Sequence, residues 1–302
     1  MTKKNIKMLR FLRIEDDIRR YDILIRKQIF ILKWKLKRKI WRFLRLAIFK
    51  FFIGNFNATS KVELTNLISF FKVYQTDKDL ICLGSDGDGG YLIPNDLQGI
   101  TANVSLGVAQ DSNFESALAD LGIHSYMADG SVEAPIIESE FFSFNKLFVG
   151  EGFTPDWISF ENCMSKFVPI NGDLILSMDI EGDEYDVLSD VLESTLVRFR
   201  IITIEFHDLD LIFLKSNYIQ LQKIMRKLLK NHSIVHMHPN TYGPTVKYLG
   251  LEIPPVMEIT LLRNDRINTR ENVIYLPHNL DSKNATWMPD IILDKTWYLL
   301  NA

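Results

Sequence analysis

The chain has 302 residues, of which 47% are hydrophobic and 24% charged, and its formal net charge is -3. This composition provides enough apolar material for one large globular domain with an appendage, and it excludes an intrinsically disordered protein. Charge is divided unevenly, because the first 50 residues hold 17 Lys or Arg against 4 Asp or Glu, whereas the remainder holds 18 against 34. A basic segment and an acidic body are therefore predicted as separate domains.

The two cysteines, Cys82 and Cys163, fit neither a metal-binding spacing nor a disulfide framework. We expect two free thiols in a reducing, cytoplasmic compartment. The chain contains no run of about 18 apolar residues, so no segment is predicted to span a bilayer. A secretory signal is not expected either, because basic residues between Lys33 and Arg45 interrupt any apolar core.

Residues 1–58 form the predicted appendage. Its apolar residues recur every three or four positions from Ile14 to Ala47, which predicts one long amphipathic helix. Lys and Arg occupy the opposite face, with Trp34 and Trp41 among them, a composition typical of helices that lie on an anionic membrane surface. We expect residues 1–52 to hold the protein peripherally on a membrane. A homo-oligomeric coiled coil is the alternative, and nucleic acid is not expected as a partner because the body is acidic.

The predicted body, residues 59–302, begins with a helix over residues 62–74. Residues 83–93 then contain four glycines within seven positions, which predicts a tight hairpin turn. Alternating Asp and Gly are also typical of a calcium loop. The EF-hand pattern is not met, however, because no Glu occupies the required twelfth position.

Short apolar runs separated by helical periodicity predict the strands of the body, at residues 102–107, 125–128, 147–149, 174–178, 201–204, 234–238 and 257–262. The last run alternates between apolar and polar residues, which favours an antiparallel strand. Strands that alternate with helices indicate an α/β fold with a mainly parallel sheet covered by helices on both faces.

Acidic residues follow two of these strands. The run at 174–178 ends in Asp179 and Glu181, at the carboxyl end of a strand, where open parallel sheets bind their ligands. Gly107 ends the first strand and Asp129 the second, about 20 residues later, and an acid in that place can accept hydrogen bonds from ribose hydroxyls. The turn after Gly107 has too few glycines to hold a pyrophosphate. A nucleoside cofactor without phosphates is therefore favoured.

Several sequence blocks stand out along the body. They are Ser105-Leu106-Gly107-Val108, Asp129-Gly130, Met178-Asp179-Ile180-Glu181-Gly182-Asp183-Glu184-Tyr185 and Ile204-Glu205-Phe206-His207, followed by the blocks around His236–Asn240 and Pro254–Thr260. Together these blocks resemble the FkbM-type methyltransferases. The similarity covers about residues 80–263. It implies a class I methyltransferase that uses S-adenosylmethionine, with a Rossmann-like seven-stranded sheet, and that acts on hydroxyl groups of sugars or secondary metabolites.

The resemblance also implies roles for individual residues. Gly107 and Asp111 would line the methionine side of the cofactor, Asp129 would hold the ribose, and Gly130 and Ser131 would border the pocket. Asp179 and Glu181 would stand at the end of the fourth strand, with Asp179 facing the sulfonium and the acceptor. Catalytic candidates are therefore Asp179, Glu205 and His207.

Two chemical arrangements are open for these candidates. His207, whose reference pKa is near 6.5, can remove the proton of the acceptor hydroxyl. Alternatively, Asp179, Glu205 and Asp208 can bind a divalent cation. The preferred function is O-methylation of a sugar, glycan or glycolipid in surface polysaccharide biosynthesis at the membrane. A nucleotide-dependent oxidoreductase and an inactive scaffold that binds the cofactor are the alternatives.

Overall fold

The computed structural model describes residues 58–299, except 88, 110, 153, 242–244, 274 and 285–289. Residues 1–52, the predicted basic helix, lie outside the described residues. Among the residues that the structure describes, no helix is both long and apolar enough to cross a lipid bilayer. Both cysteines are free thiols, as expected, with Cys82 exposed and Cys163 buried.

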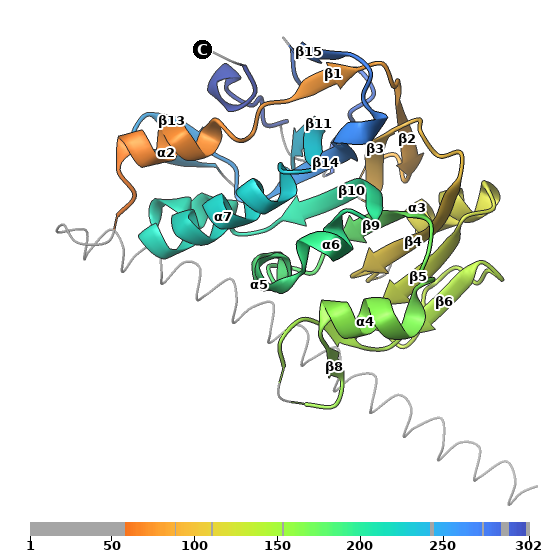
Figure 1. The fold of residues 1–302 in the computed structure, drawn as a ribbon. Helices are drawn as coiled ribbons and strands as arrows, with labels where there is room; N and C mark the ends of the chain where they lie inside the picture. Colours follow the sequence, from red (N-terminus) through yellow and green to blue (C-terminus); the bar gives the residue numbers. More distant parts are fainter. Residues whose placement is uncertain are drawn as a thin grey trace, which may run out of the picture. The chain divides into compact units, whose positions relative to one another are not determined.

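Seven strands form the central sheet, in the order β11–β14–β10–β9–β4–β5–β6 (Figure 1). All neighbours pair in parallel except β14, which is antiparallel to both β10 and β11. The α/β fold with a mainly parallel sheet and an antiparallel last strand is thus confirmed. The strands are β4 (Ile100–Leu106), β5 (His124–Ala128), β6 (Phe142–Asn145), β9 (Asp173–Met178), β10 (Phe199–Phe206), β11 (His232–Pro239) and β14 (Met257–Arg263).

The two faces of the sheet pack into separate apolar clusters because successive side chains of a strand point to opposite faces. In β9, Leu174 and Leu176 belong to the larger cluster, whereas Ile175 belongs to the smaller one. The larger cluster is covered by helices on the near side of Figure 1, namely α4 (Phe160–Phe167), α5 (Glu184–Asp190), α6 (Glu193–Leu196) and α7 (Lys215–Leu228). The smaller cluster is covered by α3 (Asn113–Asp120) and by β3 (Gly90–Pro94).

The glycine-rich segment forms the predicted hairpin, which consists of β2 (Leu80–Gly84) and β3 (Gly90–Pro94) in antiparallel register. Gly84 and Gly89, at its turn, have φ values of +97° and +79°, which L side chains rarely adopt. Contacts from β3 to β10, β11 and β14 place the hairpin over one half of the sheet. The Thr260 hydroxyl donates a hydrogen bond to the Leu92 carbonyl at 2.8 Å, which holds the hairpin against the sheet.

One strand prediction was wrong. Residues 147–149 were expected in the central sheet, but β7 (Phe148–Val149) pairs only with β8 (Trp157–Ile158), in a separate two-stranded sheet. The edge of the central sheet is instead β6, whose side chains are all half-buried. An edge strand of this kind lacks the continuous apolar run that marks a strand covered on both faces.

The first helix is shorter than predicted. Helix α2 (Lys61–Ile68) begins with a capping box in which Ser60 and Glu63 bond each other's backbone amides, and residue 74 already belongs to β1 (Tyr74–Thr76). The peripheral elements are η1 (Leu209–Phe213), β12 (Val246–Tyr248), β13 (Leu251–Ile253), η2 (Asn264–Arg266), β15 (Arg270–Asn272) and η3 (Lys295–Trp297).

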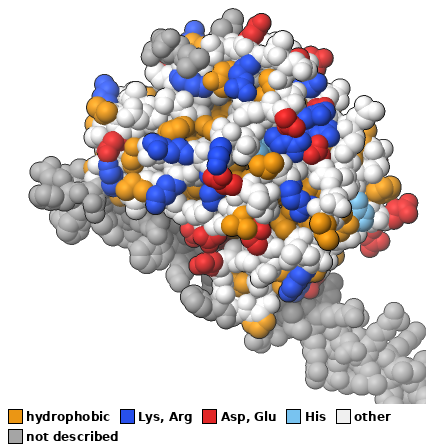
Figure 2. Space-filling model, viewed as in Figure 1, with side chains coloured by type: hydrophobic (Ala, Val, Ile, Leu, Met, Phe, Trp, Pro, Cys, Tyr) orange, Lys and Arg blue, Asp and Glu red, His pale blue; other side chains and the backbone are white. Residues whose placement is uncertain are grey.

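Basic and acidic side chains are intermixed on the face shown in Figure 2. Two lysines, one at the start of α7 and one just after its end, pair with neighbouring helices. Lys215 pairs with Glu63 on α2, and Lys230 pairs with Glu193 on α6. The Lys227 ammonium donates to carbonyls at the end of α5, including that of Ser189 at 2.6 Å. These cations therefore fasten the surrounding helices to α7.

Candidate functional site

The candidate site lies where β4, β9 and β10 end side by side. Leu106, Met178 and Ile204 are register partners, so the loops that follow these strands emerge together. Each loop contains a residue other than glycine with positive φ: Ala109 at +46°, Glu181 at +60° and Asp208 at +52°. Such conformations cost about 1–3 kcal/mol each and gather at functional sites. These backbone conformations therefore indicate that the candidate functional site lies at this end of the sheet.

Gly107 lets two of these loops approach each other. A Cβ atom on Gly107 would lie 1.7 Å from the Asp179 carbonyl oxygen, and φ at Gly107 is +79°. The Asp179 amide also donates to the Leu106 carbonyl at 2.9 Å. The glycine predicted for close approach to a ligand is thus required for close approach to the neighbouring strand.

His207 is held by two residues of the acidic motif at the start of α5. Its Nδ1 lies 3.0 Å from the Glu184 carboxylate, and its backbone carbonyl accepts a 2.8 Å hydrogen bond from the Tyr185 hydroxyl. Glu184 is fully buried, and the same carboxylate oxygen accepts from the amides of Ile180 and Gly182 at 3.1 and 3.0 Å. Glu184 thereby fixes both the acidic turn and the imidazole ring. Its role was missed from the sequence, although a Glu in the first turn after a strand could have signalled it.

The other ring nitrogen of His207 faces carboxylates at longer range. His207 Nε2 lies 3.7 Å from Asp179 and 3.9 Å from Glu181, whose side chain is half exposed. Burial lowers the pKa of His207, but the hydrogen bond with Glu184 and the charges of Glu184, Asp179 and Glu205 outweigh burial and raise that pKa well above its usual range. The carboxylates around the ring therefore favour its imidazolium form in the protein without ligands.

Asp179, Glu205 and His207 also form a cluster in which one ligand-type atom from each residue lies within 4.8 Å of the others. Two carboxylates and one imidazole are a donor set that divalent cations accept. The set differs from the predicted one, because His207 takes the place of Asp208. Asp208 instead begins the η1 turn.

Glu205 connects the cluster to the next strands of the sheet. The buried Asn240, which follows β11, donates to the Glu205 carboxylate at 2.6 Å. Asn240 lies in one of the blocks that carry the resemblance, and the structure gives it a partner in the site. Asp179, Glu184 and Glu205 together place three carboxyl groups around one imidazole, so acidic groups outnumber the one basic group of the cluster.

The residues predicted for ribose binding lie at the end of β5. Asp129 Oδ2 accepts from the Val108 and Ala109 amides at 2.9 and 2.7 Å, and Oδ1 accepts from the Ser131 amide at 2.6 Å. Asp129 thus shapes the loop after β4. A Cβ atom on Gly130 would meet the Phe148 ring at 2.3 Å, so Gly130 is required for packing.

Asp111 bonds the β2–β3 hairpin. Its Oδ2 accepts from the Ser85 hydroxyl at 2.9 Å and its Oδ1 from the Asn113 amide at 2.8 Å. Asp111 therefore links the start of α3 to the turn between β2 and β3. The structure thus brings Asp129 against the loop that Gly107 begins, and it brings Asp179, Glu205 and His207 together at the ends of β9 and β10.

No family model matches the chain, and no curated protein is significantly similar to it in sequence.

Proposed function

We propose that the protein is a class I methyltransferase that transfers the methyl group of S-adenosylmethionine to a hydroxyl group of a sugar, glycan or glycolipid. The observation that carries the proposal is the attachment of His207 to the acidic motif by Glu184 and Tyr185. The motif that carries the resemblance to FkbM-type enzymes thus supplies both groups that hold a candidate base. The seven-stranded order with one antiparallel strand agrees with the fold that this resemblance implies.

The charge of the site also supports the proposal. Its carboxylates favour a cationic ligand, and a sulfonium is such a ligand, whereas a pyrophosphate would be repelled. The loop shaped by Asp129 and Gly107 is the candidate place for the nucleoside and methionine parts, with Asp129 as a further acceptor for ribose hydroxyls. When bound, S-adenosylmethionine supplies the methyl group and leaves as S-adenosylhomocysteine.

The residues of the chain would contribute positioning and proton transfer. Glu184 holds Nδ1 of His207, so Nε2 of the neutral ring, the form favoured above the raised pKa of His207, can accept the proton of the acceptor hydroxyl. Asp179, 3.7 Å from Nε2, stabilises the imidazolium that results. Bringing oxygen and methyl carbon within about 3–3.5 Å supplies much of the remaining rate enhancement.

The test measures methyl transfer from labelled S-adenosylmethionine to a lipid-linked glycan extract. We expect His207→Gln to lower turnover by roughly 10²–10⁴ while calorimetry shows unchanged cofactor affinity. His124→Gln is the matched control, because His124 is a half-buried histidine on β5 that bonds Ser143 instead. Cofactor binding without transfer to any acceptor would instead identify a scaffold protein.

A divalent cation is the second arrangement that the same residues support. Asp179, Glu205 and His207 would be its ligands, and the cation would then lower the pKa of the acceptor hydroxyl in place of a base. Chelation separates the two arrangements. Loss of transfer in chelator, with recovery in Mg²⁺ or Mn²⁺, would establish the cation, and unchanged transfer would leave His207 as the base.

A further inference from the structure

A row of polar side chains leads from the candidate site across the sheet. Glu205 on β10 is the register partner of Glu258 on β14, and Glu258 is the register partner of His238 on β11. Met237 and Met257 belong to the larger apolar cluster, so His238 and Glu258 point to the opposite face, which the hairpin covers. Neighbouring strands lie about 4.8 Å apart. The row therefore ends about 10 Å from Glu205.

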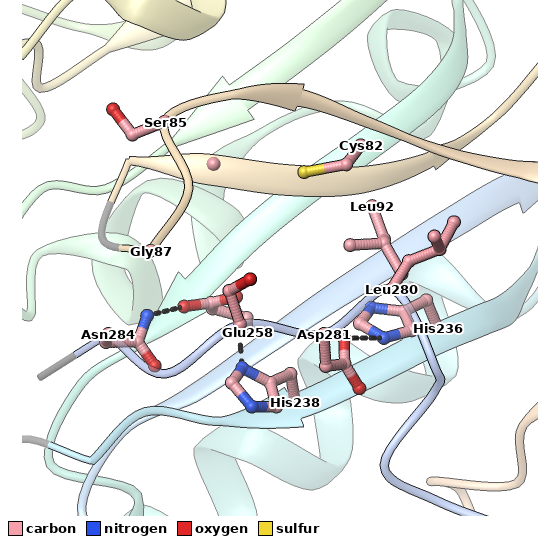
Figure 3. A pocket seen from close by; sticks show the side chains of 12 residues that line it. Cys82, Ser85, Gly87, Leu92, His236, His238, Glu258, Leu280, Asp281 and Asn284 are labelled. Atoms are coloured by element: carbon pink, nitrogen blue, oxygen red, sulfur yellow. Dashed lines mark hydrogen bonds and ion pairs between the residues drawn. The ribbon is translucent and has the colours of Figure 1, made fainter. Parts of the chain in front are cut away.

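A pocket lies at the far end of this row (Figure 3). His238 Nδ1 lies 3.7 Å from Glu258, and Asn284 Nδ2 donates to the other oxygen of Glu258 at 2.5 Å. His236 Nε2 lies 2.8 Å from Asp281. The turn of the β2–β3 hairpin forms the opposite wall, and residues 280–284 form a third. The space between them is narrow, with room for about one water-sized group.

One buried hydrogen-bond acceptor in the pocket has no partner among the described residues. Asn284 is 9% exposed, its amide is oriented by Glu258, and its Oδ1 is buried without a hydrogen-bond partner among those residues. Leaving a buried acceptor unsatisfied costs about 1–3 kcal/mol. A group that both donates to Asn284 and accepts from the wall would recover this energy.

The charged side chains that line the pocket determine which chemical group of a ligand can bind there. The twelve described residues that line the pocket include no Lys or Arg. Burial lowers the pKa of His238, but the neighbouring carboxylates of Glu258, Asp281 and Asp290 outweigh burial and raise that pKa. Both histidines of the pocket lie beside carboxylates, so a phosphate or carboxylate ligand would lack a free cationic partner, whereas a hydroxyl fits.

We propose that this pocket receives one hydroxyl group of a neutral sugar acceptor, bound by Asn284, Glu258 and His238. The inference rests on the proposed function. The pocket lies at the far end of the row that begins at Glu205.

The test is saturation-transfer NMR on the full chain, with neutral methyl glycosides of hexoses and deoxyhexoses as probes and glucose 6-phosphate for comparison. We expect at least one neutral glycoside to bind and the phosphate not to bind. Asn284→Ala and Glu258→Gln should each weaken glycoside binding about tenfold. Asn272→Ala is the matched control, because Asn272 is exposed on β15.

Two outcomes would overturn the inference: binding of none of the neutral glycosides, or equal binding by the wild type and both pocket variants. Thermal melting of each variant identifies any that does not fold, and the other variant then decides. Calorimetry with S-adenosylmethionine on the same samples judges the proposed function separately. Glycoside binding without cofactor binding would refute the methyltransferase alone, and the reverse result would refute the pocket alone.

Discussion

Carboxylates on two sides of His207 differ in distance and burial. Glu184 is fully buried and contacts Nδ1 at 3.0 Å, whereas Asp179 and Glu181 face Nε2 at 3.7 and 3.9 Å. The buried contact fixes the ring and supplies the largest contribution that raises its pKa. A base must be neutral to accept a proton, so transfer should increase as pH rises through this raised pKa.

Glu184→Gln tests that relationship. Gln keeps the shape of the side chain but removes its charge, so the pKa of His207 should fall, and the acidic limb of the pH–rate profile should move to lower pH. NMR titration of the His207 ring measures the same shift directly. Glu181→Gln should move the limb much less, because Glu181 is half exposed and 3.9 Å away. An unmoved limb in Glu184→Gln would exclude Glu184 as the group that sets this pKa.

Cofactor binding should itself change the protonation of His207. A sulfonium placed near the imidazolium repels it, so binding of S-adenosylmethionine should release a fraction of a proton at a pH just below the His207 pKa. Calorimetric titrations in two buffers with different ionisation enthalpies measure this release. S-adenosylhomocysteine lacks the positive charge and should release less, and His207→Gln should abolish the difference between the two ligands. Equal release by both would place the sulfonium far from His207.

At the scale of single elements, the junction between β4 and β9 depends on one missing side chain. Gly107→Ala should both strain the backbone and push the Asp179 carbonyl away, because the added Cβ would lie 1.7 Å from it. Gly122→Ala separates the two effects, since Gly122 has φ of +76° but nothing within 4 Å of the added atom. We expect Gly122→Ala to cost about 1 kcal/mol of unfolding free energy and Gly107→Ala several times more. If denaturant unfolding gives similar losses of unfolding free energy for the two variants, the β4–β9 junction rearranges easily around the added Cβ atom.

Most central strands could be predicted from the sequence because they are buried on both faces. The runs around Leu174–Met178 and Ile201–Ile204 are continuous and apolar, which is the pattern of a covered parallel strand. The edge strand Phe142–Asn145 could not be predicted in this way, since its four residues are half-buried and alternate between aromatic and polar side chains. Its apolar neighbour at residues 148–149 gave the stronger signal and belongs to another sheet.

The candidate site was predictable only in part. Residues that directly follow a strand, such as Asp179 and His207, could be placed from strand ends alone. Glu184 and Asn240 could not, because their partners are 23 and 35 residues away along the chain and depend on how α5 and β11 pack. Asp129 was predicted at the correct strand end, but its use by the amides of Val108 and Ala109 follows from the path of a loop.

For the whole molecule, the structure defines where the appendage can be removed. Ala58 pairs with Leu214, and Thr59 bonds the carbonyls of Ile212 and Phe213 through its hydroxyl and amide. A chain that begins at Asn57 keeps these anchors. We expect it to retain its melting temperature and its cofactor affinity while losing binding to anionic vesicles, which the full chain should show more strongly at low salt.

Charge reversal at Lys35, Arg38 and Arg42 should reproduce the loss of vesicle binding in the full chain. Stable dimers of the full chain that ignore vesicles, and that disappear on truncation, would support the coiled-coil alternative. Sedimentation and vesicle flotation of the same samples measure both properties.

The position of β14 in the sheet determines the order in which the sheet can form during synthesis. This strand lies between β10 and β11 but is synthesised after both, so until residue 263 has left the ribosome β10 has an open edge and β11 has no partner in the sheet. A nascent chain at that stage exposes unpaired backbone along a long apolar strand, which favours association with other chains. Glu205, Glu258 and His238 become neighbours only when β14 closes the gap, and the row they form is therefore among the last features that the folding chain acquires.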